Sequence, residues 1–490
     1  MNQNENDGTV KKKSLTINSI FYLAYNLLNV LFPFVTGIYI TRVLLPDNVG
    51  LIESARNIVQ YFVLLAYLGI PTYGMREVAK CRNDKETLNK LYSELMTINS
   101  ISTIIFSVLY LTICVSVSSI RANFSLYLIV GIVLICNLFN NSFLYEGLEE
   151  FKYISIRNFI FKVLSFLLLL LLVKSNDDYL WYAFIGAFGT AGNNIINIIN
   201  SRKYVKFSLK NLNMMQHIKP ILFLVVVTIA IEINSLVDVT MLKLFKGNEI
   251  VAFYTYGSKI YKIILQVVNT FTMVLIPRIS FYYKNGRFDD FNKLVSKTFK
   301  IIIILTIPII IGIFFVSDYL ICRMYTDVYY NSANVLKVLS FIILISPIGY
   351  LLGSRILLVT GNEKKMIIPV GTGAIVNIIL NYFLIQNYSE IGAAIASVAS
   401  EFVIMSIYVF MGRKHYSLVN VFNSIIKVIF ASTIMFIYLL LISKISLDPL
   451  YVTLIQVAGA IMIYFSILIF TKEEVCFSYI KKCFTIFRKS

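Results

Sequence analysis

Apolar stretches of near-constant length recur along the chain and are separated by short polar segments. Each stretch holds roughly 20 residues, and a helix of that length spans about 30 Å, the thickness of a bilayer's hydrocarbon core. The pattern predicts an all-α membrane protein with about 14 transmembrane helices. The expected spans are 15–40, 51–71, 93–115, 124–144, 157–173, 180–200, 218–241, 251–276, 299–317, 334–359, 366–386, 391–411, 422–442 and 450–470.

Composition and charge support this interpretation. Hydrophobic residues make up 58% of the chain, and the mean hydropathy is +0.76. The net charge of +18 could indicate nucleic acid, but the basic residues gather in the short segments between spans. About 30 of the 44 Lys and Arg residues fall on one side of the expected topology and 7 on the other. The positive-inside rule therefore predicts that both termini are cytoplasmic.

Signs of enzyme chemistry are sparse. The two histidines, His217 and His415, fall in expected cytoplasmic loops, and the six cysteines show no metal-ligand spacing. No outer loop exceeds about 20 residues, and no GxxxxGK[ST] phosphate loop is present. We therefore expect a transporter rather than an enzyme, without a metal or cofactor.

A basic segment after the sixth span divides the chain into halves. The second helix of each half starts with an acidic residue and carries a cation in its third turn, as Asp47 with Arg56 and Glu249 with Lys259 show. This weak internal repeat is typical of secondary transporters. The expected division is a cytoplasmic tail 1–14, an N-terminal lobe 15–200, a basic linker 201–219, a second lobe 220–411, and a last helix pair with a cytoplasmic tail 412–490.

Polar residues inside four of the spans recur every three or four positions, which places them on one face of each helix. A charged residue inside a span is costly unless it faces a partner or a wet cavity. Spans 1, 2, 7 and 8 are therefore the expected walls of an aqueous cavity. The candidate substrate-binding residues are Tyr22, Tyr25, Asn29, Arg56, Gln60, Lys259, Lys262 and Gln266. The candidate coupling carboxylates are Glu53, Glu232 and Asp238.

Depth in the membrane separates two interpretations of the cations. Counted from the outer helix ends, Arg56 lies roughly 8 Å deep, Lys259 roughly 12 Å and Lys262 roughly 16 Å. These cations could bind an anionic substrate, or could form internal ion pairs with Glu232 or Asp238. If such a pair breaks as the lobes move, the freed carboxylate could bind a proton or sodium ion. Four other cations are expected to reach the membrane interface as anchors: Lys162, Lys337, Arg355 and Lys427.

Four segments give the sequence a family resemblance. They are Leu68-Gly69-Ile70-Pro71-Thr72-Tyr73-Gly74-Met75-Arg76-Glu77, Met324-Tyr325-Thr326-Asp327-Val328-Tyr329-Tyr330, Leu357-Leu358-Val359-Thr360-Gly361-Asn362-Glu363-Lys364, and Ile391-Gly392-Ala393-Ala394-Ile395-Ala396-Ser397 with Asn377 and Glu401. In combination they resemble the polysaccharide (O-antigen and capsule repeat-unit, Wzx-type) flippases of the multidrug/oligosaccharidyl-lipid/polysaccharide exporter superfamily. The resemblance covers essentially the whole chain.

The resemblance implies two pseudo-symmetric lobes around a central cavity lined by spans 1, 2, 7 and 8. It also implies a bacterial cytoplasmic membrane location and a lipid-linked (polyprenyl-diphosphate) oligosaccharide as substrate, with a polysaccharide polymerase and glycosyltransferases as partners. Three alternatives stay open. A lipid II-type flippase shares the cavity chemistry. A drug/cation antiporter of the same superfamily is disfavoured by the cavity cations, and a membrane glycosyltransferase or polymerase by the short outer loops.

Overall fold

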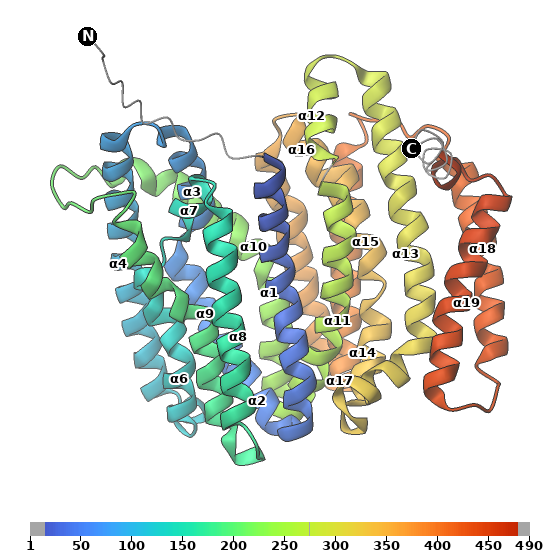
Figure 1. Cartoon of the computed structure of the whole chain (residues 1–490), viewed down its shortest axis with the longest axis horizontal. Coiled ribbons are helices and arrows are strands. Elements are labelled where there is room, and N and C mark those ends of the chain that lie inside the picture. The colour runs from blue at the N-terminus through green and yellow to red at the C-terminus, as the bar shows by residue number, and fades with distance from the viewer. Residues whose placement is uncertain (1–14, 274, 479–490) are drawn as a thin grey trace, which may run out of the picture. The chain divides into compact units, whose positions relative to one another are not determined.

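The structure is a computed structural model that describes residues 15–273 and 275–478. Within these ranges it does not describe the side chains of residues 15–20, 22–24, 26–27, 30, 227, 230–231, 271–273, 276 and 363. Within these residues all regular structure is helical (Figure 1). Each of the expected spans falls on one helix or on a run of consecutive helical segments, and 334–359 is the most divided of them. The all-α prediction is confirmed.

The helices differ widely in length. Their bounds are α1 (Leu15–Val43), α2 (Pro46–Tyr67), α3 (Ile70–Cys81), α4 (Lys85–Ser116), α5 (Ser118–Arg121), α6 (Phe124–Ile135), α7 (Ser142–Gly147), α8 (Phe151–Leu172), α9 (Tyr179–Ser201), α10 (Met215–Lys246), α11 (Asn248–Met273), α12 (Ile276–Lys284), α13 (Phe288–Tyr325), α14 (Asn331–Leu339), α15 (Ile342–Gly349), α16 (Ile356–Val359), α17 (Ile367–Gly412), α18 (Val421–Ile442) and α19 (Pro449–Phe470). Among the described residues, 8 helical segments are long and apolar enough to cross a membrane, and shorter apolar helices accompany them.

Helix α17 contains two of the expected spans. It is broken at Ser389, whose φ of 54° and ψ of −131° are not helical. The two halves lie side by side, because a Cβ on Gly373 would come 2.3 Å from the Ile404 side chain. The absence of a side chain on Gly373 permits this close approach, whereas Gly371 faces open space in the described part of the chain.

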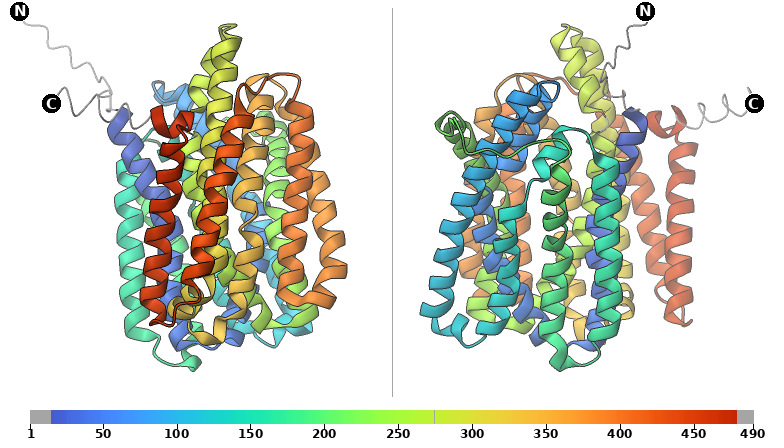
Figure 2. Two further views of the ribbon diagram at one scale, coloured as in Figure 1. Left: turned by 90° about the vertical axis from the view of Figure 1, so that its right-hand side faces the viewer. Right: turned by 60° about the vertical axis from the view of Figure 1, so that its left-hand side comes forward.

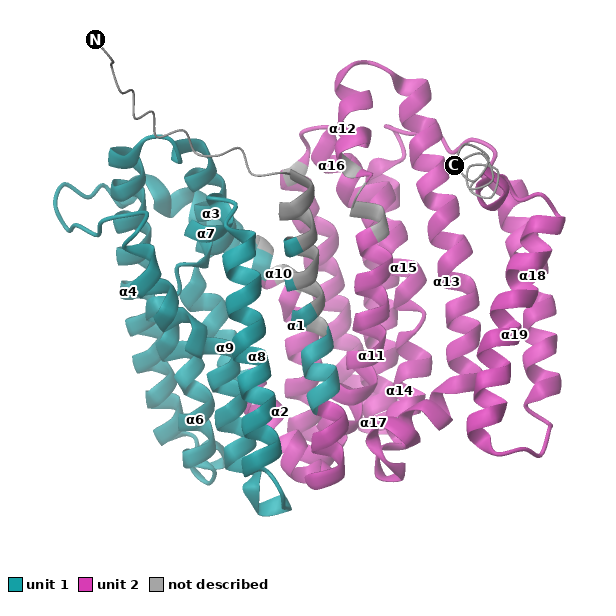
Figure 3. Ribbon diagram, viewed as in Figure 1, with its two compact units in different colours: residues 1–36, 58–228 teal, residues 37–57, 229–490 magenta. Residues whose placement is uncertain are grey.

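The chain forms two compact units, shown in different colours in Figure 3. Unit 1 comprises the residues up to 36 together with 58–228, and unit 2 comprises 37–57 and 229–490. The division crosses α1, α2 and α10. Segment 37–57 belongs to unit 2 through specific contacts: Arg42 donates to the carbonyl of Arg323 (3.0 Å), and Asn57 donates to the carbonyl of Leu236 (2.9 Å).

In unit 1, α9 packs against α6 and α8, and α4 packs against α3 and α6. Figure 2 shows these helices running side by side. Polar side chains cross between them, since the Tyr110 hydroxyl donates to the carbonyl of Tyr127 (2.7 Å). The single tryptophan of the chain, Trp181, lies in the first turn of α9 and is half exposed.

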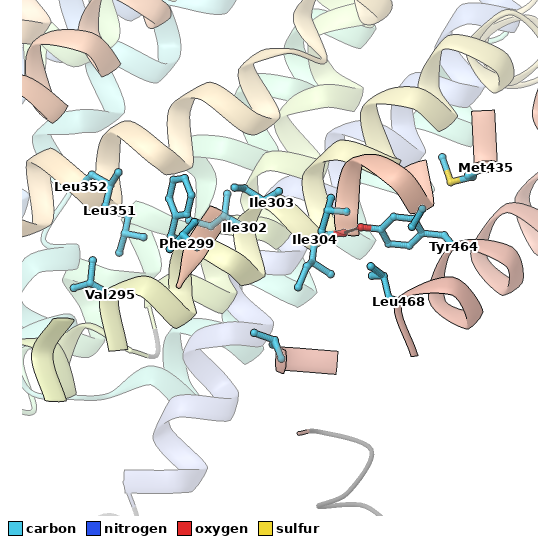
Figure 4. Packing of buried hydrophobic residues seen from close by; sticks show 14 of the residues in the cluster. Val295, Phe299, Ile302, Ile303, Ile304, Leu351, Leu352, Met435, Tyr464 and Leu468 are labelled. Carbon is cyan, nitrogen blue, oxygen red and sulfur yellow. Dashed lines mark hydrogen bonds between the residues drawn. The ribbon is translucent and has the colours of Figure 1, made fainter. Parts of the chain in front are cut away.

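In unit 2, the long helix α13 supplies much of the apolar core. Its residues Ile302, Ile303 and Ile304 belong to one buried cluster with Met435 of α18 and Leu468 of α19 (Figure 4). Helices α18 and α19 form an antiparallel pair, visible in Figure 2. The hydroxyl of Tyr464 in α19 donates to the carbonyl of Ile304 (2.8 Å), so a buried polar group is satisfied across this packing.

Three of the segments that carry the family resemblance lie at breaks in the helical backbone. Gly69 (φ 70°) separates α2 from α3, and Thr326 (φ 80°) ends α13. Gly361 (φ 73°) ends α16, where the amide of Asn362 donates to the carbonyl of Leu357 (2.8 Å) in the pattern that commonly terminates helices. The resemblance therefore reflects, in part, where the helices must stop.

Candidate functional site

A polar pocket lies inside unit 1, between α1, α2, α8, α9 and the turn that follows α6. Its volume is about 200 Å³. We call it the unit 1 pocket. Two of the expected substrate-binding residues, Tyr25 and Asn29, line it. The other lining residues are Val63, Tyr67, Val133, Asn137, Asn140, Ser142, Arg157, Asn158, Lys162, Gly189, Thr190, Ala191, Asn193 and Asn194.

The unit 1 pocket carries positive charge without a matching carboxylate. Arg157 and Lys162 lie two helical turns or less apart on α8, and no Asp or Glu is among the described lining residues. Arg157 is buried and donates a hydrogen bond to the side chain of Asn197. The carboxylate of Glu146 interacts with it electrostatically from beyond ion-pair distance. Lys162 lies 4.8 Å from the centre of the Phe32 ring. Neither cation has a carboxylate within 4 Å among the described residues. The electrostatic environment therefore favours an anion.

Side-chain amides fill much of the remaining lining. Asn158 donates to Asn29 (2.8 Å), Asn140 donates to the Tyr67 hydroxyl, and Asn194 donates to the carbonyl of Cys136 (3.3 Å). The pocket therefore presents amide and hydroxyl groups from several helices, each able to donate or accept hydrogen bonds.

A different polar site lies in unit 2, where α2 and α11 meet. Glu53 accepts hydrogen bonds from two cations, Lys259 (3.0 Å) and Arg56 (3.2 Å). Lys259 also lies 4.2 Å from the centre of the Tyr256 ring. We call Glu53, Arg56 and Lys259 the Glu53 cluster. The single carboxylate neutralises only one of the two cations, so the cluster as a whole keeps a net positive charge.

The remaining predicted residues fall around these two sites. Lys262 is exposed and lies in the electrostatic field of Glu232, Asp238, Lys259 and Glu53. Glu232 is exposed and Gln266 is half-buried, both in unit 2, while Gln60 is exposed in the unit 1 part of α2. The side chain of Tyr22 lies outside the described residues, as does the expected tail 1–14.

Asp238 is the centre of a third site, entirely within unit 2. It is 2% exposed. One of its oxygens accepts from the Tyr254 hydroxyl (2.6 Å) and the Ser397 hydroxyl (2.5 Å). The other accepts from the amides of Asn377 (3.0 Å) and Asn381 (2.6 Å). We call these five residues the Asp238 cluster.

The Asp238 cluster satisfies a buried carboxylate with neutral donors alone. No Lys, Arg or His of the described residues lies within ion-pair distance of Asp238. One interpretation of the sequence is that Lys259 or Lys262 pairs with Glu232 or Asp238; in the structure the carboxylate paired with Lys259 is Glu53 instead. The difference has a physical reason, because neutral donors from α11 and both halves of α17 already surround Asp238.

Sequence reasoning did not find several residues of these sites. Arg157 is the first residue of the expected span 157–173 and is not among the candidates named from the sequence, although it is 7% exposed and lines the unit 1 pocket. Asn377 and Asn381 lie four residues apart on α17, and an asparagine pair at this spacing inside an apolar span is a signal that could have indicated a polar site. Ser397 and Asn377 belong to one of the segments that carry the family resemblance, but nothing in the sequence connects them with Asp238, and Tyr254 had no signal of its own.

His217 also lies in an unexpected environment. It was expected in a cytoplasmic loop, but it lies in the first turn of α10 and is buried. One ring nitrogen lies 2.8 Å from a carboxylate oxygen of Glu94, and the other lies 2.8 Å from the Tyr73 hydroxyl. These contacts join α3, α4 and the start of α10 within unit 1, which indicates a structural role.

A further pocket in unit 2 is almost wholly apolar. Its volume is about 500 Å³, and α11, α13, α14, α18 and α19 line it. Ile260, Pro308, Gly312, Leu439 and Phe465 are among its residues. Hydrogen-bonding groups are few, so the pocket suits a hydrocarbon chain rather than a polar ligand.

Comparisons with known proteins agree with this architecture. The family described as "Polysaccharide biosynthesis protein" matches residues 15–282, and the MatE family matches residues 224–383. The chain is 25% identical over 390 residues to a protein named "Putative O-antigen transporter" from Shigella dysenteriae, covering 77% of this chain and 94% of that protein. It is 25% identical over 417 residues to the "Capsular polysaccharide biosynthesis protein CapF" of Staphylococcus aureus, covering 81% and 99%.

Solved structures show the same fold at low sequence identity. The lipid II flippase MurJ, in an inward closed conformation, superposes with a TM-score of 0.76 at 16% identity, covering 94% of this chain and 99% of that one. An inward-facing multidrug resistance MATE transporter superposes with a TM-score of 0.60 at 14% identity, covering 81% and 97%. The fold is that of a two-lobed, multi-pass membrane transporter. The chain belongs to the polysaccharide biosynthesis protein family, whose match spans more than half of its length.

Proposed function

We propose that this chain transports a lipid-linked oligosaccharide repeat unit across the bacterial cytoplasmic membrane by alternating access, for the synthesis of a surface polysaccharide. The observation that carries the proposal is the presence of cation-bearing polar sites inside an otherwise apolar helical transporter. The names of the relatives, an O-antigen transporter and a capsular polysaccharide biosynthesis protein, support the same substrate class.

The polar sites answer the physical problem that such a substrate poses. A sugar headgroup cannot cross hydrocarbon unaided, because each polar group left without a hydrogen-bond partner there costs several kcal/mol. Amides, hydroxyls and cations of the protein can replace the lost water. We propose that Lys262, together with Arg56 and Lys259 when they are released from Glu53, binds the diphosphate, and that Gln60 and Gln266 contact the adjoining headgroup.

The polyprenyl tail has a different requirement. It stays in an apolar environment throughout transport, so it needs no polar partner. We propose that the apolar pocket of unit 2 holds part of this tail, with Ile264 and Phe465 among its contacts. A Gly312→Phe substitution should fill the pocket and lower transport, whereas Phe470→Ala, at an exposed residue of α19, should not.

Complementation tests the proposed function. The gene is expressed in a strain that lacks its own O-antigen transporter and supplies a matching repeat unit, and surface polysaccharide is measured together with lipid-linked precursor. We expect surface polymer to return and the accumulated precursor to fall. A Lys262→Ala variant should restore less polymer at equal membrane abundance. Polymer that returns without the chain, or precursor that stays accumulated with it, would reject the proposal.

We also propose that the Asp238 cluster binds the coupling cation, a proton or a sodium ion. The four hydrogen-bond donors to Asp238 are all neutral, so this carboxylate lacks a counter-charge in direct contact among the described residues, and a bound cation would supply it. The donor chemistry fits: Asp238, Tyr254, Ser397 and the asparagine carbonyls all offer oxygen atoms, and Oδ1 of Asn381 has no hydrogen-bond partner in the described part of the chain. Polar groups inside helical transporters commonly coordinate sodium ions or protons.

The purified protein distinguishes the two ions. If sodium binds, thermal unfolding in detergent should shift upward with sodium chloride but not with choline chloride at equal ionic strength. If a proton binds instead, the shift should follow pH and be insensitive to sodium. Asp238→Asn should abolish either response. A response that survives in this variant would place coupling elsewhere, with Glu53 and Glu232 as the remaining candidates.

Two alternative functions predict different results in cells. A lipid II-type flippase would support peptidoglycan synthesis when the resident flippase is depleted, and a drug/cation antiporter would raise resistance to organic cations. The cations of the unit 1 pocket and the Glu53 cluster disfavour cationic cargo.

We further propose that both termini are cytoplasmic, and that the chain is divided into lobes 15–200 and 220–411, the linker 201–219 between them, and the last helices in 412–490. We also propose that the chain cooperates with a polysaccharide polymerase and glycosyltransferases.

A further inference from the structure

The unit 1 pocket combines two cations with many side-chain amides, a combination that transport of a sugar headgroup does not by itself require. We propose that it binds a single acidic sugar residue, one that bears a carboxylate, of the transported oligosaccharide. That this sugar comes from the transported oligosaccharide rests on the proposed function. That it is acidic is inferred from the geometry of unit 1 alone.

The amides of the pocket point to a sugar. An asparagine side chain offers a donor and an acceptor side by side, which suits pairs of neighbouring hydroxyl groups. Asn193 is buried and lines the pocket, and Oδ1 of the buried Asn137 has no hydrogen-bond partner within the described part of the chain. Tyr25 and Tyr67 add flat ring faces and hydroxyls to the lining.

The cations of the pocket point to an acidic sugar. Arg157 is 7% exposed, and its Nε has no hydrogen-bond partner among the described residues. An arginine guanidinium matches a carboxylate through two parallel hydrogen bonds, and burying its charge without a counter-ion is costly. Lys162 adds a second cation one to two turns further along α8. A carboxylate ligand would compensate both charges.

The size of the pocket limits the ligand to one residue. Its volume of about 200 Å³ lies below the roughly 300–1,000 Å³ typical of sites for drug-sized molecules. A whole oligosaccharide does not fit this volume, whereas one ring does. A diphosphate would satisfy the cations but would leave most of the amides without sugar hydroxyls, so the lining favours the carboxylate-bearing ring.

Binding to the purified full-length protein in detergent tests this assignment. The probes are glucuronate, glucose as its neutral counterpart, and inorganic pyrophosphate, and saturation-transfer NMR or calorimetry measures their affinities. We expect glucuronate to bind at least tenfold more tightly than either of the other two. Equal or tighter binding of glucose would overturn the role of the cations, and tighter binding of pyrophosphate would overturn the role of the amides.

Variants tie the binding to the pocket. Asn193→Asp keeps the size of the side chain but places a negative charge in the lining, and should weaken glucuronate binding at least tenfold. Lys162→Met removes one cation with little change of length and should weaken it about tenfold, while glucose binding stays unchanged. Lys152→Met is the matched control, because Lys152 is exposed on the same helix and does not line the pocket. Thermal unfolding confirms that each variant is folded.

The results separate the two proposals. If the chain restores surface polysaccharide but no probe binding depends on Asn193 or Lys162, the acidic-sugar pocket is wrong and the transport function stands. If glucuronate binding depends on both residues but the chain restores no polysaccharide, the pocket chemistry stands and the proposed function is wrong.

Discussion

The unit 1 pocket and the Asp238 cluster are opposite solutions to placing charge inside a membrane protein. In unit 1, Arg157 and Lys162 are cations without a carboxylate within ion-pair distance among the described residues. In unit 2, Asp238 is a carboxylate without a cation within ion-pair distance in the part of the chain that the structure describes. Both rely on neutral hydrogen-bonding groups, because leaving a buried charge without any partner is costly. This difference underlies our two proposals, an anionic ligand in unit 1 and a cation in unit 2.

The Glu53 cluster provides the intermediate case. There, Lys259 and Arg56 share one carboxylate, so the protein supplies its own counter-charge. Ligand binding at this cluster must compete with an existing ion pair, whereas binding at the other two sites need not. We therefore expect substitutions at the three sites to differ in size and in kind.

The largest effect should come from Asp238→Asn. The NH2 of the new amide would face two hydrogen-bond donors, either those of Asn377 and Asn381 or those of Tyr254 and Ser397, which it cannot accept from. The negative charge proposed to hold the cation would also be lost. We expect transport, measured as surface polysaccharide at equal protein abundance, to fall at least tenfold. Ser397→Ala is the control, since it removes one of four donors and keeps the charge. Transport that is as low in Ser397→Ala as in Asp238→Asn would show that hydrogen bonding rather than charge matters.

The next largest effect should come from Arg157→Met. The substitution leaves the buried Asn197 without its donor, and an unsatisfied buried polar group costs about 1–3 kcal/mol. Removal of an uncompensated charge offsets part of this cost. We expect a lower Tm in the absence of ligand, together with loss of the stabilisation by acidic sugars. An unchanged Tm with retained sugar stabilisation would contradict the comparison between the two sites.

A double-mutant cycle measures the intermediate case. Glu53→Gln and Lys259→Met are compared, singly and together, by chemical or thermal unfolding. Both side chains are partly exposed, so we expect a coupling energy of about 1 kcal/mol rather than the several kcal/mol of a fully buried pair. Arg56→Met should show a smaller coupling to Glu53, because this side chain is more exposed. A coupling near zero would mean that the pair does not contribute to stability.

The smallest effect should come from an exposed carboxylate outside the spans. Asp84 caps α4: hydrogen bonds from the Thr87 hydroxyl and from backbone amides hold its pKa below the usual value. A depressed folded pKa means that the stabilisation is present above the unfolded pKa and is lost as pH falls through the folded pKa. We expect Asp84→Ala to lower the Tm slightly at neutral pH, with the difference from wild type shrinking progressively as the pH falls below about 4. A difference that persists in acid would exclude the cap as its cause.

The sequence predicted the helical spans well because their lengths and apolar composition are set locally by the bilayer. It also predicted that α2 and α11 carry a polar face, and Glu53, Arg56 and Lys259 do meet there. The partner of Lys259 could not be predicted, because Glu53 lies 206 residues away in sequence. The same limit applies to Asp238, whose four donors come from α11 and from both halves of α17.

Trp181 gives unit 1 an intrinsic optical reporter. It is the sole indole of the chain and lies at the start of α9, the helix that also carries Asn193 and Asn194 of the unit 1 pocket. Its ring packs edge-on against Phe184, and about twelve residues of helix, roughly 18 Å, separate it from these asparagines. Selectively excited fluorescence therefore follows α9 and the surroundings of its first turn without any attached dye.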